Sequence, residues 1–278
     1  MMWQLLTTLL VLQIVQPVDS KESPWNKALD FGTTLEDYVK FYPDMTLIED
    51  AVTVCAWVKK RLSGTIRSWI TYTTTTQRYE ILISDAGAYN YIHNSRLGVD
   101  KDVYVPLNTW THECNTWNST SGHLRVYYNG TFVKSRIIEN RDPIGLGGYM
   151  VLGHDAGSKS TSEVFGGQLM KLNIFGEEMT GAEIAELYNG GRCSEVEKKY
   201  EDIRHITWES ILEQERYGKV YEVDSDCPAD DDTDDGDDTD DGDDEEEEDD
   251  EDGEADEEEE KEEEYFEIGA AWDLLGEL

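Results

Sequence analysis

Between residues 51 and 175 the chain alternates short apolar or β-branched runs with turn residues. Residues 52–58 place apolar side chains at alternate positions, which is typical of a half-buried strand. Asn129-Gly130 separates two such runs and favours a tight hairpin turn, because both residues tolerate positive φ. Many short strands at this spacing predict an antiparallel sandwich rather than a sheet of βαβ units. The other predicted strands are 79–84, 110–117, 124–128, 132–138, 149–152 and 168–175.

One helix is predicted against this background. Thr180 and Glu183 have the spacing of a capping box, and apolar residues recur at helical spacing over 184–188. Gly190-Gly191 can end the helix. We therefore expect an all-β, two-sheet antiparallel jelly-roll sandwich with one helix, whose apolar stripe packs against one of the sheets.

The N-terminus has the pattern of a targeting segment. Residues 5–15 form an apolar run that is shorter than the roughly 20 residues a membrane span requires, and compact residues follow before Ser20. We expect a signal peptide over residues 1–20, with a buried N-terminal element as the alternative. No other run approaches a spanning length, so we expect a secreted, extracellular protein with no membrane span and a folded domain over residues 24–228.

Charge divides the chain into two parts. Its 278 residues carry 62 acidic and 23 basic side chains, a net charge of −39. Residues 229–264 contain 28 acidic residues and one Lys, so they hold 27 of the net negative charges. This balance excludes electrostatic binding to nucleic acid, which needs excess Lys and Arg.

A segment this acidic, with almost no apolar surface, is expected to be disordered. Dense carboxylates attract cations, so residues 229–264 could bind Ca²⁺ weakly, or a basic partner or mineral surface. A solubilising tail without a specific partner is the alternative. Residues 265–278 regain apolar character and could dock on a partner or on the domain.

An even number of cysteines in a secreted chain predicts disulfides. Two bridges are expected, with three pairings open, and a zinc site is disfavoured because no Cys-x-x-Cys pair occurs. Asn118-Ser119-Thr120 and Asn129-Gly130-Thr131 both match the acceptor pattern Asn-x-Ser/Thr. Asn118 and Asn129 are therefore predicted glycosylation sites. The four cysteines are Cys55, Cys114, Cys193 and Cys227.

The sequence offers little for catalysis. The five histidines lack the spacing of a metalloprotease, and no Gly-x-Ser-x-Gly turn is present. A jelly-roll glycosidase would need acidic residues placed on one sheet face, and the body has no compact Glu-x-Asp-x-x-Glu strand. We therefore expect a binding protein rather than an enzyme.

A specific resemblance lies in residues 112–119. His112-Glu113-Cys114-Asn115-Thr116-Trp117-Asn118-Ser119 is similar to the pentraxin signature His-x-Cys-x-Ser/Thr-Trp-x-Ser/Thr at all five specified positions. The strand over 79–83, the Val151-Leu152-Gly153 segment and the capped helix extend the similarity over residues 27–223. The resemblance implies a two-sheet jelly roll with one long helix. It also implies that Cys55 pairs with Cys114, which leaves Cys193 for Cys227.

The resemblance also implies a calcium site, which this sequence retains only in part. Asp155 stands where the family has its first acidic ligand, and the Ala156 carbonyl and Glu163 could add oxygens. The family's Asp-Asn pair before the Glu-Ile-Leu-Ile strand is replaced by Arg78-Tyr79, and an Arg repels Ca²⁺. Phosphocholine-binding members carry a Phe after that strand, where this chain has Ser84, so we do not expect phosphocholine as the ligand.

The sequence thus predicts a secreted pentraxin-like protein that binds extracellular polar or glycan ligands, with Ca²⁺ as a candidate cofactor. The resemblance implies a homo-oligomer, often a pentameric ring, in which weakly binding subunits gain avidity. The alternative is an acidic calcium-buffering or mineral-matrix protein that acts through its polyacidic tail.

Overall fold

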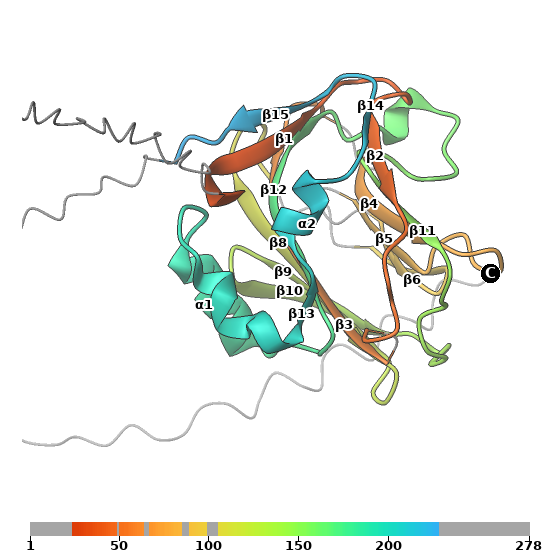
Figure 1. Cartoon of the computed structure of the whole chain (residues 1–278). Helices are drawn as coiled ribbons and strands as arrows, with labels where there is room; N and C mark the ends of the chain where they lie inside the picture. The colour runs from red at the N-terminus through yellow and green to blue at the C-terminus, as the bar shows by residue number, and fades with distance from the viewer. Residues whose placement is uncertain (1–23, 49, 64–66, 85–88, 99–104, 228–278) are drawn as a thin grey trace, which may run out of the picture. The chain divides into compact units, whose positions relative to one another are not determined.

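The computed structural model describes residues 24–48, 50–63, 67–84, 89–98 and 105–227 (Figure 1). The predicted signal peptide (1–20), the polyacidic segment (229–264) and the C-terminal segment (265–278) lie outside the described residues, so these expectations stay predictions. Among the described residues, no helix is both long enough and apolar enough to cross a membrane.

Two antiparallel sheets make up the domain, as the strand pattern predicts. The larger one has the order β10-β9-β8-β3-β12-β1-β15, with β13 beside β12. Its strands are β1 (Lys27–Phe31), β3 (Ala51–Lys60), β8 (Thr111–Asn118), β9 (His123–Tyr128), β10 (Thr131–Ile137), β12 (Gly167–Phe175), β13 (Arg204–Ile206) and β15 (Val220–Asp224). We call it the eight-stranded sheet.

The smaller one, the seven-stranded sheet, has the order β14-β2-β11-β4-β5-β6-β7. Its strands are β2 (Tyr38–Phe41), β4 (Ser68–Thr73), β5 (Ile81–Ser84), β6 (Asn90–Ile92), β7 (Ser95–Leu97), β11 (Tyr149–Leu152) and β14 (Arg216–Tyr217). The two sheets pack face to face over a core that includes the fully buried Trp69, Tyr72 and Trp117. Trp117 of the signature is therefore a packing residue of the core.

Helix α1 (Gly181–Gly190) covers the outer face of the eight-stranded sheet. Thr180 accepts a hydrogen bond from the backbone N–H of Glu183, whose side chain accepts one from Thr180, so the predicted capping box is confirmed. Ile184 and Leu187 pack on Tyr127 and Phe175. Figure 1 shows α1 beside β8, β9 and β10, on the side away from β4, β5 and β11.

The predicted hairpin between β9 and β10 is confirmed. Asn129 and Gly130 have φ values of 47° and 75°, the left-handed conformation that a tight hairpin turn needs. A Cβ on Gly130 would lie 3.1 Å from atoms of Ala185 and Tyr188, because α1 passes directly over the turn. Glycine at this position thus serves both the turn and the packing of the helix.

The structure differs from the sequence pattern in two respects. Strand β3, expected to be half-buried, is buried on both faces, because α1 and the residues around it cover the face that points away from the core. A second helix, α2 (Trp208–Leu212), adds to the predicted one. Thr207 caps it, and Trp208 and Ile211 bury its apolar side. Short 3₁₀ segments are η1 (Pro24–Asn26), η3 (Thr161–Glu163) and η4 (Val196–Ile203).

The outer face of the seven-stranded sheet is organised differently. Helices α1 and α2 make their main contacts with β10, β12 and the 3₁₀ segments η4 and η1 rather than with this face. Instead, the segment between β11 and β12 lies over it. Because this segment covers the central strands, every residue of β4 and β5 is buried, and side chains such as Arg78, Tyr91 and Arg96 reach solvent beside it.

Candidate functional site

Asp155 lies in the loop between β11 and β12, whose two ends are held together. The backbone N–H of Phe165 donates to the carbonyl of Gly153 at 2.8 Å. Gly153 has a φ of 105°, and a Cβ there would come within 2.7 Å of the Phe31 ring, so only glycine fits this turn. The Thr71 hydroxyl donates to the carbonyl of His154, which fixes the start of the loop on the outer face of the seven-stranded sheet.

The path of this loop explains how distant residues meet. Strands β5 and β11 each pair antiparallel with β4, so they run in the same direction. The end of β11 and the start of β5 therefore lie at opposite ends of the sheet. After Gly153 the chain folds back across the sheet face, and this brings Asp155 to Arg78 and Tyr79, which precede β5.

The carboxylate of Asp155 is buried and heavily hydrogen-bonded. Its Oδ2 atom accepts from Arg78 Nη2 at 2.9 Å and from the Tyr79 hydroxyl at 2.7 Å. Its Oδ1 atom accepts from the backbone N–H of Gly157 at 2.9 Å. Asp155 is 4% exposed, whereas the Arg78 side chain is 54% exposed. The ion pair thus has a buried negative end and an open positive end.

The environment of Tyr79 keeps its hydroxyl protonated. Burial raises the pKa of Tyr79 first, its hydrogen bond to Asp155 raises it further, and the charge of Glu163 adds to the effect. Tyr79 therefore remains a hydrogen-bond donor to Asp155 at neutral pH. Glu163, in the first turn of η3, lies near enough for its charge to act on this cluster.

The described residues do not fit a calcium ion at Asp155. A carboxylate has about four acceptor positions, and three of those on Asp155 already receive hydrogen bonds. Calcium takes about six to eight oxygen ligands, and the candidates here are Asp155, the Ala156 carbonyl and Glu163. The guanidinium of Arg78 supplies positive charge where the ion would be needed.

A second grouping of metal-ligating side chains occurs in the described part of the chain. Ligand atoms of Cys55, His112 and Cys114 lie within 4.8 Å of one another. Cys55 and Cys114 form a disulfide between directly opposed positions of β3 and β8, so their sulfurs are not thiolate ligands. This grouping is structural.

The other predicted residues lie away from Asp155. Cys193 and Cys227 form the second disulfide, so the structure has the two pairs that the resemblance implies. Asn129 is exposed, and its Oδ1 accepts from the His112 N–H at 3.0 Å, while Asn118 is half-buried at the end of β8 and accepts from the Ser121 N–H. Glycosylation at Asn118 and Asn129 stays a prediction.

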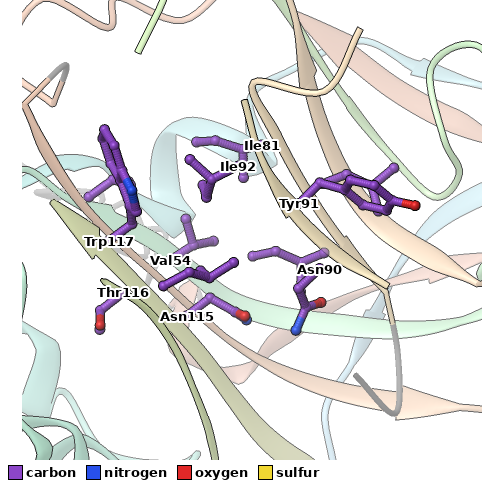
Figure 2. A pocket seen from close by; sticks show the side chains of 12 residues that line it. Val54, Ile81, Asn90, Tyr91, Ile92, Asn115, Thr116 and Trp117 are labelled. Atoms are coloured by element: carbon purple, nitrogen blue, oxygen red, sulfur yellow. The ribbon is translucent and has the colours of Figure 1, made fainter. Parts of the chain in front are cut away.

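A small cavity lies in the interior between the sheets (Figure 2). Its volume of about 10 Å³ is room for about one water molecule, so it is too small for a recognition site. Asn90 and Asn115 bring buried amides to its wall among apolar side chains. Figure 2 shows the ring of Tyr91 directed away from Val54 and Trp117, consistent with a position on the outer side of β6.

Sequence reasoning marked Arg78, Tyr79 and Asp155 but did not connect them. The departure from the Asp-Asn pair was visible in the sequence, yet the contact with Asp155 depends on a loop that folds back across a sheet. Tyr91 and Arg96 went unnoticed, because short strands such as β6 and β7 give little periodic signal.

Comparison with known proteins agrees with this architecture. Residues 31–185 match the family described as the concanavalin A-like lectin/glucanases superfamily. The chain is 25% identical over 167 residues to the pentraxin-related protein PTX3 of Bos taurus, covering 56% of this chain and 43% of that protein. It is 27% identical over 173 residues to C-reactive protein of Danio rerio, covering 58% of this chain and 76% of that protein.

The chain matches less than half the length of some relatives. Its alignment with human neuronal pentraxin-1, at 27% identity, covers 52% of this chain and 34% of that protein. A heptameric SAP-like pentraxin from Limulus polyphemus has a similar fold, with a TM-score of 0.57 at 18% identity, covering 73% of this chain and 97% of that one. The chain belongs to the concanavalin A-like lectin/glucanases superfamily, and its folded body is a pentraxin-like domain.

Proposed function

We propose that this chain is a secreted recognition protein whose folded body binds an extracellular polar or glycan ligand on the outer face of the seven-stranded sheet. The observation that carries the proposal is the contrast between the two outer faces. Helix α1 covers one, whereas the other presents the Asp155 loop and the exposed guanidinium of Arg78. Exposed polar side chains on a rigid sheet are suited to ligand contact.

Calcium dependence is a separate part of this proposal. A calcium-dependent form would use Asp155, the Ala156 carbonyl and Glu163, and it would require Arg78 to leave Asp155. The 2.9 Å contact between Arg78 and Asp155 favours recognition without calcium. Measuring ligand binding in chelator and then in excess calcium separates the two forms.

The relatives support binding rather than catalysis, since the curated proteins similar to this chain are named as pentraxins or C-reactive protein. We extend the proposal to self-assembly, because a ring of identical subunits multiplies a weak affinity. Native mass spectrometry of the secreted protein tests this. A mass at a multiple of the single-chain mass supports assembly, and a monomer at micromolar concentration contradicts it.

A glycan array probed with the full-length secreted chain tests the recognition function. We expect retention of a defined subset of glycans, in chelator as well as in calcium. A synthetic peptide of residues 229–264 is the control, because it carries the dense negative charge without the folded body. Binding no stronger than that of the peptide for every glycan would refute the proposed function.

A further inference from the structure

Five side chains form one continuous surface at the β5–β7 end of the seven-stranded sheet: Arg78, Tyr79, Tyr89, Tyr91 and Arg96. We call this surface the Arg–Tyr patch. Its tyrosines are half-buried, so each ring is held by the sheet and still reaches solvent. The patch combines planar cations with aromatic faces on the outer side of the seven-stranded sheet, whereas α1 and α2 pack mainly on β10 and β12.

Arg78 is held in place while most of its donors remain available. Nη2 donates to Asp155, and the guanidinium lies 4.8 Å from the centre of the Tyr79 ring. It also lies against Gly157, where a Cβ would come within 2.7 Å of Nε. The hydrogen bonds between described residues use Nη2 alone, and Nε packs against Gly157, so Nη1 of this held guanidinium is left for a ligand.

Tyr91 and Arg96 continue the surface across β6 and β7. They are directly opposed in the ladder, and the Tyr91 ring lies 5.0 Å from that of Tyr79. The guanidinium of Arg96 lies 3.7 Å from the centre of the Tyr89 ring. Burial raises the pKa of Tyr91, and the charges of Arg96 and Arg78 oppose this rise, so both cations act on the same ring.

We propose that the Arg–Tyr patch is a calcium-independent binding site for an anionic glycan, a sugar chain that carries carboxylate or sulfate groups. This inference rests on the proposed recognition function and names its ligand class. The planar donors of arginine match the oxygens of carboxylate and sulfate, and tyrosine offers an apolar face with a polar tip to a sugar ring. Arg78 already balances the charge of Asp155, so no metal ion is needed to prepare the site.

Isothermal titration calorimetry of the full-length chain in chelator tests the inference with three tetrasaccharides. A heparin-derived tetrasaccharide carries sulfate and carboxylate, a hyaluronan tetrasaccharide carries carboxylate alone, and chitotetraose is neutral. We expect at least one anionic tetrasaccharide to bind at least tenfold more tightly than chitotetraose, with a dissociation constant unchanged by added calcium. Comparing the first two probes shows whether sulfate or carboxylate is recognised.

Three variants locate the site. We expect Arg78→Gln and Arg96→Gln each to weaken binding of the anionic tetrasaccharide about tenfold or more, as loss of charge-assisted hydrogen bonds predicts. Lys198→Gln is the matched control, because Lys198 is 53% exposed and paired with Glu195 but lies in η4, beside α1. It should change the dissociation constant less than twofold. If Arg78→Gln disturbs the Asp155 loop, Arg96→Gln still tests the site, because Arg96 lies on β7.

Each contrary result has a distinct meaning. If chitotetraose alone binds tightly, the recognition function is supported but the anionic-glycan site is overturned. The same conclusion follows if the anionic tetrasaccharides bind only when calcium is present. If Lys198→Gln weakens tetrasaccharide binding as much as the arginine variants do, or if a single-stranded DNA oligonucleotide binds as tightly as the anionic tetrasaccharide, the protein attracts polyanions in general. Either result would also overturn the proposed site. Absence of binding to every sugar, together with a negative glycan array, would overturn both proposals.

Discussion

At the scale of single residues, His112 connects the signature to acid stability. It is 3% exposed, and its ring centre lies 5.1 Å from that of Trp57 and 6.2 Å from that of Tyr188. Burial lowers the pKa of His112 to about 3, and the charge of Lys171 contributes. The unfolded chain binds this proton below a pH of about 6.5, but the native protein does so only near pH 3, so stability is lost as pH falls through this window.

We therefore predict that His112→Gln flattens the acid side of the stability profile. Between pH 6.5 and 4.5 this histidine lowers the free energy of unfolding by about 2 kcal/mol, because the unfolded chain takes up the proton that the native protein does not. Urea unfolding at several pH values measures the slope. The difference in free energy of unfolding between the native sequence and the variant should narrow as pH falls. Parallel profiles for His112→Gln and the native sequence would contradict this.

Lys171 is a second buried titratable residue with a structural task. Its Nζ lies 3.0 Å from Glu197 Oε2, and it also donates to the carbonyls of Gly191 and Ser194. The side chains of Lys171 and Glu197 are 0% and 5% exposed. Burial lowers the pKa of Lys171 and raises that of Glu197, while their mutual attraction opposes both shifts. The pair ties β12 to the segment that follows α1.

Breaking this pair should be costly. Lys171→Met leaves Glu197 buried without its cation, and we expect the free energy of unfolding in urea to fall by about 3–5 kcal/mol. Lys198→Met is the matched control, because its pair with Glu195 is about half exposed and should contribute less than about 1 kcal/mol. Similar losses of unfolding free energy in the two variants would show that burial does not determine how much the Lys171–Glu197 pair stabilises the protein.

At the scale of elements, periodic patterns predicted the longer strands and the helix. The predicted 149–152 strand coincides with β11, and the predicted 110–117 strand is shifted from β8 by one residue at each end. Strands β6 and β7, of three residues each, were missed because so few positions show no period. Strand β1 was missed because its identity depends on partners from β12 and β15, which lie far away in the sequence.

The candidate site was predictable only in its parts, for the same reason. The sequence shows Arg78 at a position where the pentraxin family has an acidic ligand, and it shows Asp155 in the second loop. Their ion pair depends on β4 lying between β5 and β11, and on a reversal at Gly153. Local sequence patterns contain neither of these facts.

This arrangement predicts that two substitutions can restore a calcium site. Arg78→Asp with Tyr79→Asn removes the donors that hold Asp155 and returns the Asp-Asn pair that the family resemblance implies. We expect the double variant to gain one saturable calcium site with a dissociation constant below about 1 mM, measured by calorimetry on a chain that ends at Pro228. Adding Asp155→Ala should abolish the gain. An unchanged titration in a correctly folded double variant would show that the loop cannot hold the ion.

At the scale of the whole molecule, the folded body and the acidic segment make separate predictions about calcium. Residues 229–264 hold 27 net negative charges, and dense carboxylates condense cations without a defined site. In the body, the carboxylate of Asp155 is already satisfied by Arg78, Tyr79 and Gly157. Calcium binding by the intact protein should therefore come from the segment.

Calcium calorimetry on the full-length chain and on the chain that ends at Pro228 measures this division. We expect the full-length chain to bind several ions weakly, with heat that decreases as ionic strength rises, because exposed charges are screened by salt. The shorter chain should show no saturable site. A site that persists in the shorter chain and weakens in Asp155→Ala would show that calcium displaces Arg78, and the recognition function would then be calcium-dependent. Loss of all binding with the segment would assign calcium to residues 229–278 and leave ligand recognition to the body.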